Sequence, residues 1–297
     1  MTVAAVEAGG TKFVVALVDV PEAGMPRVLA RSRVPTTVPE ATVDAVAAWF
    51  RSQAADRAAP GRLGLASFGP LTGRPGEPGW GRIGRTPKPG WAAFDLAGAL
   101  SGRLGLPVSV DTDVNAAALA EGRWGACRGL SDYAYVTVGT GIGGGAVSDG
   151  RLVHGAGHPE MGHLRPAREP DDAFAGLCPF HGDCLEGLAS GPALAARWGR
   201  PAEELPPDHP AWDLEARYLA WAMTALAFML APARVVLGGG LGGVPGLLRR
   251  IRERLPAALG GYLPRLESPG AVEEFVVAPG LGADSGILGA AALVLEA

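Results

Sequence analysis

The order of hydrophobic and polar positions divides the first part of the chain into short strands and helices. Residues 3–7 and 13–18 are rich in apolar and β-branched residues, and they flank the segment Ala8-Gly9-Gly10-Thr11-Lys12. This pattern predicts two strands joined by a glycine turn. Further along, the pattern predicts a helix over 41–58, a strand over 62–68, a loop over 70–90, a helix over 93–104, a strand over 107–111 and a helical run over 116–124 that Asp113 opens.

A second strand, glycine turn and strand begin at Tyr133, about 130 residues after the first, with the sequence YAYVTVGTGIGGGAV. Two halves that each begin with a glycine-turned hairpin predict a duplicated α/β fold with a cleft between two lobes. The rest of the pattern predicts an irregular segment over 151–191, helices over 213–230, 244–259 and 287–296, strands over 233–237 and 273–277, and a loop over 279–286.

Composition narrows the class of protein. The 297 residues are 48% hydrophobic and 19% charged, which suits one large or two ordinary domains with a buried core. The net charge of −4 and the lack of any run of Lys or Arg argue against binding to nucleic acid or anionic membranes. The chain shows no charged-then-apolar leader, and its longest apolar stretch, 218–233, is short for a bilayer span.

Cysteine, lysine and asparagine are all scarce. Three cysteines make a disulfide scaffold improbable and favour a reducing cytoplasm. Of the 26 basic residues, 24 are Arg and two are Lys, and the chain has a single Asn, a bias typical of GC-rich codon usage. Under such a bias, the remaining Lys12, Lys88 and Asn115 are expected to be chemically required.

Both glycine turns contain residues that suit phosphate binding. Gly139-x-Gly141-x-x-Gly144 matches the dinucleotide fingerprint in letters, but that motif needs a following helix, and here a strand and a turn follow. A glycine backbone lets N–H groups approach phosphate oxygens, and Thr or Lys adds donors. Gly9-Gly10-Thr11-Lys12 and Gly139-Thr140-Gly141 both have this make-up. From spacing alone, two ordinary hairpin turns fit equally well.

Asp113 is the candidate proton acceptor. It follows an apolar strand and precedes a helix, and carboxylates at strand ends are frequent in the active sites of α/β proteins. Such a carboxylate can orient a hydroxyl and accept its proton during phosphoryl transfer. Asp113 fits a helix N-cap as well. Asp111 is a second candidate for the proton acceptor.

His163, Cys178, His181 and Cys184 form the pattern H-x14-C-x2-H-x2-C. Two thiolates and two imidazoles suit a tetrahedral zinc site, and four protein ligands leave no position for water, so the zinc would be structural. A Cys178–Cys184 disulfide or unliganded side chains are the alternatives, and His158 competes with His163 as the first ligand. His154 and His209 have no partner in the sequence and are interpreted as structural.

Six segments occur in the order and spacing found in the ROK-family sugar kinases: EAGGTK, DTDVNAAALAE, VGTGIGGG, HPEMGH, CPFHGDCLEG and VLGGGL. The segment TPKPGW and the CxxHxxC variant most resemble the bacterial fructokinase branch of that family. The resemblance covers nearly the whole chain. It implies an actin-like ATPase (ribonuclease H-like) fold with two lobes and a central cleft. The expected lobes are residues 1–111, completed by 285–297, and residues 112–284, with a zinc-binding loop at 158–187.

The resemblance also implies residue roles. Asp113 matches the catalytic base, Asn115 would contact the sugar or a supporting loop, and Glu160 and Glu186 would bind the sugar. His163 matches the first zinc ligand. Many family members carry Asp where this chain has Glu7, near the expected magnesium. The residues expected to bind the nucleotide are Gly9, Gly10, Thr11, Lys12, Thr140, Gly141, Pro192, Gly238, Gly239 and Gly240.

The expected function is therefore phosphorylation of a hexose at its 6-hydroxyl by ATP with Mg²⁺, with fructose the first choice of substrate, in a cytoplasmic homodimer. Glucose, mannose or an amino sugar is the alternative substrate, because one hydroxyl or methylene separates these sugars. A sugar-sensing regulator is the alternative from another class. Such regulators carry a helix-turn-helix domain before the first glycine turn, where this sequence has six residues before Glu7.

Overall fold

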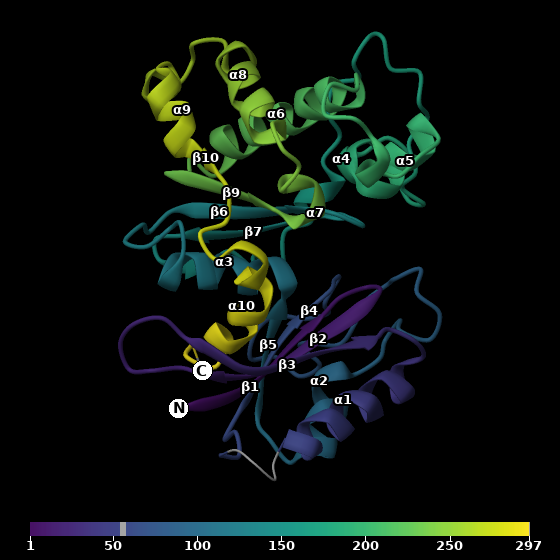
Figure 1. Cartoon of the computed structure of the whole chain (residues 1–297), viewed down its shortest axis with the longest axis vertical. Coiled ribbons are helices and arrows are strands. Elements are labelled where there is room, and N and C mark those ends of the chain that lie inside the picture. The colour runs from purple at the N-terminus through teal and green to yellow at the C-terminus, as the bar shows by residue number, and fades with distance from the viewer. Residues whose placement is uncertain (54–57, 297) are drawn as a thin grey trace. The chain divides into compact units, whose positions relative to one another are not determined.

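The computed structural model describes residues 1–53 and 58–296, which form two compact units (Figure 1). The first unit consists of Met1–Gly129, Leu152–Pro159 and Ala283–Ala297, and the second consists of Leu130–Arg151 and Glu160–Gly282. The chain thus returns to the first unit at its end. The functional lobes expected at 1–111 and 112–284 stay a prediction.

The first unit is built on a five-stranded sheet in the order β3-β2-β1-β4-β5. The strands β1, β2 and β3 pair antiparallel, and β4 and β5 continue the sheet parallel to β1. The glycine turn predicted from the sequence joins β1 and β2. The strands are β1 (Thr2–Ala8), β2 (Lys12–Asp19), β3 (Arg27–Pro35), β4 (Leu63–Ser67) and β5 (Val108–Thr112).

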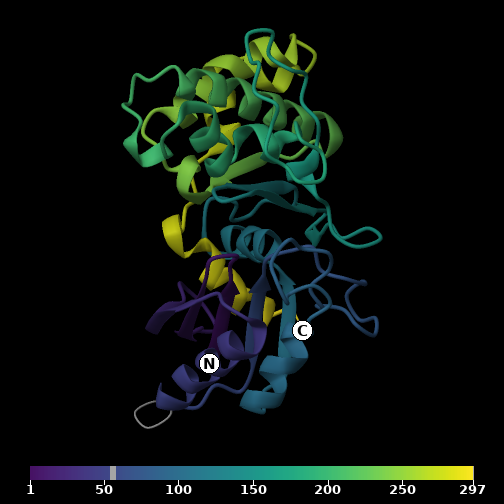
Figure 2. The same ribbon diagram turned by 90° about the vertical axis from the view of Figure 1, so that its right-hand side faces the viewer.

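Two pairs of helices pack in the first unit: α1 (Pro39–Gln53) with α2 (Leu96–Leu104), and α3 (Asp113–Trp124) with α10 (Ser285–Leu293). Figures 1 and 2 both show α1 and α2 side by side. The helix α10 also packs on β1 and β4, where a side chain at Gly64 would collide with the carbonyl of Ala290. The core includes Trp91, whose indole N–H donates to the carbonyl of Thr37. Trp91 is therefore part of the core of the first unit.

The second unit repeats the topology of the first. Its sheet has the order β10-β9-β6-β7-β8, so that its first strand along the chain again lies between the second and the fourth. The strands β6 and β7 are antiparallel, and β6, β9 and β10 run parallel. The shared order agrees with the duplication predicted from the two glycine-turned hairpins. The strands are β6 (Tyr133–Val138), β7 (Ile142–Ser148), β8 (Arg151–Leu152), β9 (Arg234–Gly238) and β10 (Val276–Val277).

Helices of the second unit gather beyond its sheet, with α6 packed against α8 (Figure 2). The long α6 is largely buried, as its apolar sequence predicts. The helices are α4 (Leu185–Ala189), α5 (Gly191–Trp198), α6 (Ala211–Met229), α7 (Gly239–Gly242), α8 (Leu247–Leu259) and α9 (Pro269–Phe275), and single 3-10 turns cover Met161–His163, Ala202–Glu204, Pro264–Leu266 and Gly282–Asp284.

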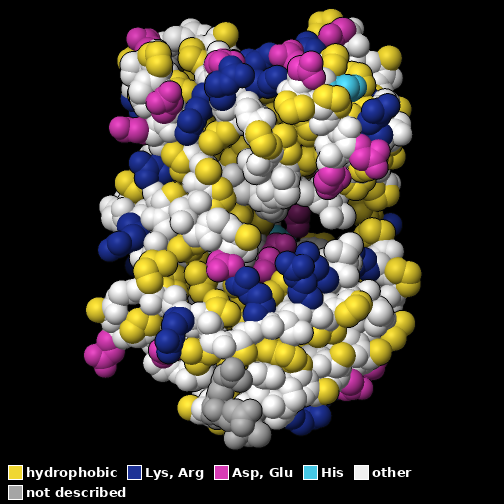
Figure 3. All heavy atoms as spheres, viewed as in Figure 1, with side chains coloured by type: hydrophobic (Ala, Val, Ile, Leu, Met, Phe, Trp, Pro, Cys, Tyr) yellow, Lys and Arg dark blue, Asp and Glu magenta, His cyan; other side chains and the backbone are white. Residues whose placement is uncertain are grey.

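Lys and Arg side chains gather over α8 (Figure 3), and the structure shows what these arginines bind. Arg250 donates to the carbonyl of Pro207, and Arg252 donates to the carbonyls of Glu273 and Val276. Arg254 pairs with Asp213. These guanidinium groups therefore hold α8 to neighbouring segments of the same unit.

The strand predicted over 273–277 is largely wrong, because α9 runs through Phe275 and only Val276–Val277 pairs with β9. Ser268 caps α9 by accepting a hydrogen bond from the Ala271 N–H, and Pro269 occupies the first helical turn. This start signal outweighs the local β propensity. The end of the helix predicted over 41–58 falls on 54–57, outside the described residues. Within the described residues, no helix has the length and apolarity to cross a bilayer.

Candidate functional site

The first glycine turn connects β1 to β2 with a tight backbone arrangement. The Gly9 N–H donates to the carbonyl of Lys12 at 3.0 Å, and a Cβ at Gly9 would lie 2.7 Å from that oxygen. The hydroxyl of Thr36 donates to the carbonyl of Gly9. The side chains of Thr11 and Lys12 are exposed. The turn therefore presents a hydroxyl and an ammonium to solvent on a fixed backbone.

Glu7 lies on β1 just before this turn. Burial raises the pKa of its carboxyl group, while the nearby Arg31 and Lys12 oppose that shift. The carboxylate packs against Gly286, where any side chain would collide with it. No hydrogen bond to the Glu7 carboxylate is found within residues 1–53 and 58–296. A half-buried carboxylate without such a hydrogen bond suits a hard cation such as Mg²⁺, because Mg²⁺ favours carboxylate and phosphate oxygens.

Asp113 is the first residue of α3, directly after β5. The N-cap is Thr112, whose hydroxyl accepts a hydrogen bond from the Asn115 N–H, so the N-cap interpretation of Asp113 is wrong. The Asp113 carboxylate accepts the N–H of Val114 and is partly exposed. Its place at the first turn of a helix stabilises the negative charge. The Asp113 carboxylate thus remains partly accessible to solvent.

Asp111 and His154 form a pair that the sequence did not reveal. The Nε2 of His154 lies 2.6 Å from Oδ2 of the buried Asp111, and this hydrogen bond raises the pKa of the imidazole. The other carboxylate oxygen, Oδ1, accepts hydrogen bonds from the Thr112 N–H and the Asn115 amide. His154 thus has a partner that is far from it in the sequence, and this contact is compatible with the structural role expected for His154.

These contacts give Asp111 a supporting role beside Asp113. Asn115 is buried, and its Oδ1 has no hydrogen-bond partner among residues 1–53 and 58–296. Contact between Asn115 and a sugar or a supporting loop stays a prediction, and its side-chain amide donates to Asp111 on β5. His154 belongs to a segment of the first unit that is remote in sequence, and its ring stands edge-on to Trp80. The network fixes the start of α3.

The second glycine turn, between β6 and β7, is held from two sides within the second unit. The Gly139 carbonyl accepts the N–H of Gly191 at 2.8 Å. Oε2 of Glu186 accepts the N–H of Ile142 at 3.0 Å, and a Cβ at Gly141 would lie 2.5 Å from that oxygen. A side chain at position 141 would have to displace this carboxylate from its bond to Ile142. Thr140 at the apex of the turn is exposed.

The glycines 238–240 follow β9 and lie against the end of β6. Gly239 has φ +82°, and a side chain there would collide with the backbone of Val138. A Cβ at Gly139 would lie 3.9 Å from the N atom of Gly240. Pro192 directly follows Gly191, which is bonded to the second turn. The predicted nucleotide-binding residues of the second unit therefore come together around one turn, and Gly9–Lys12 lie in the first unit.

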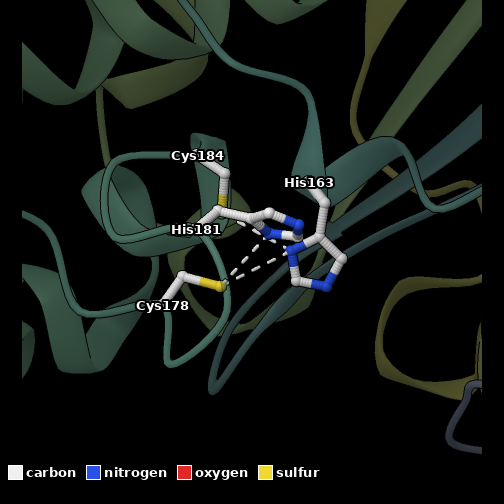
Figure 4. Close-up of side chains that lie close together, drawn as sticks. All are labelled: His163, Cys178, His181 and Cys184. Atoms are coloured by element: carbon white, nitrogen blue, oxygen red, sulfur yellow. Dashed lines mark hydrogen bonds between the residues drawn. The ribbon is translucent and has the colours of Figure 1, made fainter.

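The four predicted metal ligands converge in the second unit (Figure 4). Their ligand atoms all lie within 4.8 Å of one another. Nδ1 of His163 lies 3.4 Å from Sγ of Cys184 and 3.8 Å from Sγ of Cys178, and Nδ1 of His181 lies 3.5 Å from Sγ of Cys178. Tetrahedral zinc with bonds of about 2.0–2.3 Å separates its ligands by about 3.3–3.8 Å. The donor set and its spacing fit zinc.

The backbone between the cysteines is a tight loop. Cys178 and Gly182 exchange two backbone hydrogen bonds, and Gly182 has φ +68°, which favours glycine. Both cysteines are free thiols and buried, so the disulfide alternative is wrong. Burial raises the pKa of the Cys184 thiol to about 11. A bound cation would have to offset this cost to hold the thiolate.

The two predicted sugar-binding carboxylates flank this metal cluster. Glu160 immediately precedes the turn Met161–His163 that carries the first ligand, and its side chain is exposed. Glu186 lies on α4, two residues after Cys184, and reaches the second glycine turn. The metal cluster and the turn therefore share one short helix. Binding of a sugar by either carboxylate stays a prediction.

Comparison with known proteins places the whole chain in one family. Residues 3–297 match the ROK family. A fructokinase from Zymomonas mobilis is 44% identical over 98% of this chain and 96% of that protein, and a fructokinase from Pediococcus pentosaceus is 39% identical over 97% and 96%. The chain belongs to the ROK family.

Solved structures agree with this assignment. A ROK hexokinase from Thermus thermophilus is similar with a TM-score of 0.75 and 31% identity, covering 100% of this chain and 99% of that one. A ROK glucokinase from Streptomyces griseus, solved with glucose and AMPPNP, gives 0.75 and 27% and covers 100% of both chains. The two mixed five-stranded sheets with their helices are the actin-like ATPase fold.

Proposed function

We propose that this protein transfers the γ-phosphoryl group of ATP to the 6-hydroxyl of a hexose, with fructose as the preferred substrate. The observation that carries the proposal is the similarity over nearly the full length to two fructokinases. The partly exposed carboxylate of Asp113 and the two glycine turns supply the chemistry that such a reaction needs. We further propose that the protein works as a homodimer in the cytoplasm.

In this mechanism Asp113 accepts the proton of the 6-hydroxyl as the sugar oxygen bonds to the γ-phosphorus. The bond between that phosphorus and the bridging oxygen breaks, and ADP leaves with the electron pair. Asp111, held by His154 and Asn115, keeps the start of α3 in place beneath Asp113. Glu160 and Glu186 accept hydroxyl hydrogen bonds from the sugar.

Each unit contributes a glycine turn to ATP binding in this proposal. Gly9, Gly10, Thr11 and Lys12 offer backbone N–H groups, a hydroxyl and an ammonium, and the second unit offers Thr140 and Gly141. The segments at Pro192 and 238–240 contact the nucleoside. Magnesium, when bound, neutralises phosphate charge, and Glu7 is the carboxylate placed to hold it or its water.

Zinc bound to His163, Cys178, His181 and Cys184 has a structural role in this proposal. Four protein ligands close the site to water, so the ion stabilises the loop rather than activating a nucleophile. Because Glu186 follows the last ligand by two residues, the ion also fixes the carboxylate that meets Gly141. Metal analysis of the purified protein should give about one equivalent of zinc per chain.

A hexose panel tests the proposal. Purified protein is mixed with Mg²⁺-ATP and fructose, glucose, mannose or glucosamine, and ADP release is followed, with Asp113→Asn as the matched control. Fructose should give the highest kcat/KM, and ³¹P and ¹³C NMR of the product should place the phosphate on C6. A higher kcat/KM for another hexose would replace fructose as the substrate.

If none of the four sugars raises ADP release above the background of the Asp113→Asn variant, the kinase proposal is refuted. The alternative of a sugar-sensing regulator then predicts sugar binding without turnover, together with retarded DNA in a gel-shift experiment. Light scattering of the eluted protein tests the homodimer, for which twice the chain mass of 30.3 kDa is expected.

A further inference from the structure

Both lysines of the chain lie at the first glycine turn. Lys88 comes from the long loop after β4, and its Nζ donates to the carbonyl of Gly10 at 2.7 Å. The ammonium also lies 5.6 Å from the centre of the Phe68 ring. A side chain at Gly10 would collide with this ammonium. Lys88 is thus in direct contact with the turn, and Lys12 ends the same turn.

The Lys88 ammonium has no negative partner within residues 1–53 and 58–296. An ammonium carries three N–H donors, and the Gly10 carbonyl accepts one of them. Burial lowers the pKa of this half-buried group. Taking a cation partly out of water without a counter-charge is unfavourable, and such groups are frequent at anion-binding sites.

We propose that the Lys88 ammonium binds the terminal phosphates of the nucleotide at the first glycine turn and stabilises the charge that develops there during phosphoryl transfer. This inference rests on the proposed kinase function. The two remaining N–H groups supply hydrogen bonds to phosphate oxygens, and the bond to Gly10 fixes the position of the ammonium on the turn. A cation that is positioned in advance stabilises the transition state with little reorganisation.

The alternative role is mechanical, in which Lys88 only braces the turn. The two roles differ in the ligands that they affect. A phosphate ligand changes the binding of ATP and ADP and leaves adenosine and hexose binding alone. If Lys88 only supports the turn, its loss changes the stability of the protein, and it affects the binding of ADP and adenosine equally.

Substitution tests this difference. Lys88→Met keeps a long unbranched side chain and removes the charge, Lys88→Arg keeps the charge, and Arg74→Met removes an exposed charge from the same loop. Lys88→Met should raise the Kd of ADP and ATP at least about 10-fold and lower kcat about 100-fold. Its adenosine and hexose affinities should stay within about twofold of the native values, and Arg74→Met should leave every value unchanged.

Lys88→Arg should recover part of the lost ADP affinity, because its guanidinium also binds phosphate. Unchanged ADP affinity in Lys88→Met, or an equal loss for ADP and adenosine, would overturn the inference. If the native enzyme and the Lys88→Met variant turn over hexose equally well, only the role of Lys88 is refuted. A native enzyme without hexose-dependent turnover refutes the kinase proposal itself.

A second measurement uses the native protein and does not depend on the folding of a variant. Only Lys12, Lys88 and the N-terminus carry amines, so acylation by an amine reagent can be followed at each by mass spectrometry. Mg²⁺-ADP should slow the modification of Lys88 at least about fivefold, and adenosine should not. Equal modification rates with and without Mg²⁺-ADP would contradict the proposal.

Discussion

The two glycine turns have similar backbones and differ in what holds them. The first turn carries Thr11 and Lys12 and receives the ammonium of Lys88, so its surroundings are positively charged. The second turn has no cation of its own and is held by the Glu186 carboxylate on a helix that begins at the metal cluster. The first turn thus has cationic side chains around it, whereas the second turn is held in place by a carboxylate.

The largest expected effect is kinetic and belongs to the first unit. Asp113→Asn should lower kcat about 1,000-fold, because the amide cannot accept the proton of the sugar hydroxyl. The melting temperature and the Kd of the hexose should stay close to the native values, since Thr112 rather than Asp113 caps α3. Steady-state kinetics and calorimetry measure these quantities, and retained turnover would remove Asp113 from the reaction.

The next effect concerns the metal cluster of the second unit. Cys178→Ser should release most of the bound zinc and lower the melting temperature of the second unit by about 5 °C or more, because metal binding contributes directly to folding. Metal analysis and calorimetry provide the test, with Cys127→Ser as the control, since Cys127 is a buried cysteine outside the cluster. Equal losses of zinc and of melting temperature in the two variants would contradict a zinc-binding role of the cluster.

Matched glycine substitutions should destabilise the two turns to different extents. Gly141→Ala places a methyl group against the Glu186 carboxylate, which is tied to the Ile142 N–H. Gly10→Ala displaces the half-buried Lys88 ammonium, whose hydrogen bond to the Gly10 carbonyl can be replaced by water at a small cost in stability. Gly141→Ala should therefore destabilise its unit by about 1–3 kcal/mol, and Gly10→Ala by less. Urea unfolding measures both, and the reverse order would contradict the comparison.

The smallest effect is a pH dependence in the first unit. The hydrogen bond that His154 donates to the Asp111 carboxylate raises the pKa of His154 above its ordinary value of 6.5. The protonated pair therefore stabilises the folded state fully below about pH 6.5, and this contribution is lost as the pH rises through the raised pKa. The melting temperature of the native protein should exceed that of His154→Gln by about 2–4 °C more at pH 5.5 than at pH 9. An equal difference at both values would contradict the assignment.

Local signals in the sequence predicted much of the fold. The glycine-turned hairpins, the buried α6 and the four metal ligands each depend on residues that are close in sequence or on a recognisable spacing. The error at 273–277 arose because Val and Phe favour strands, whereas Ser268 and Pro269 start a helix. The family resemblance agrees with the near full-length match to the ROK family.

The supporting contacts of the candidate site could not be predicted in this way. His154 and Asp111 are 43 residues apart, and Lys88 and Gly10 are 78 apart. Neither pair belongs to a short motif, so only the folded chain brings the partners together. The scarcity of lysine was the one sequence signal that favoured Lys88.

The closing helix α10 has a consequence for the order in which the protein can form. Glu121 on α3 accepts the hydroxyl of Ser285 at 2.7 Å, and α10 packs on β1 and β4. During synthesis, all five strands of the second unit, β6 to β10, are therefore made before the first unit receives its last helix. A released chain that ends at Gly282 should show a protease-resistant second unit and a first unit that is still open to digestion.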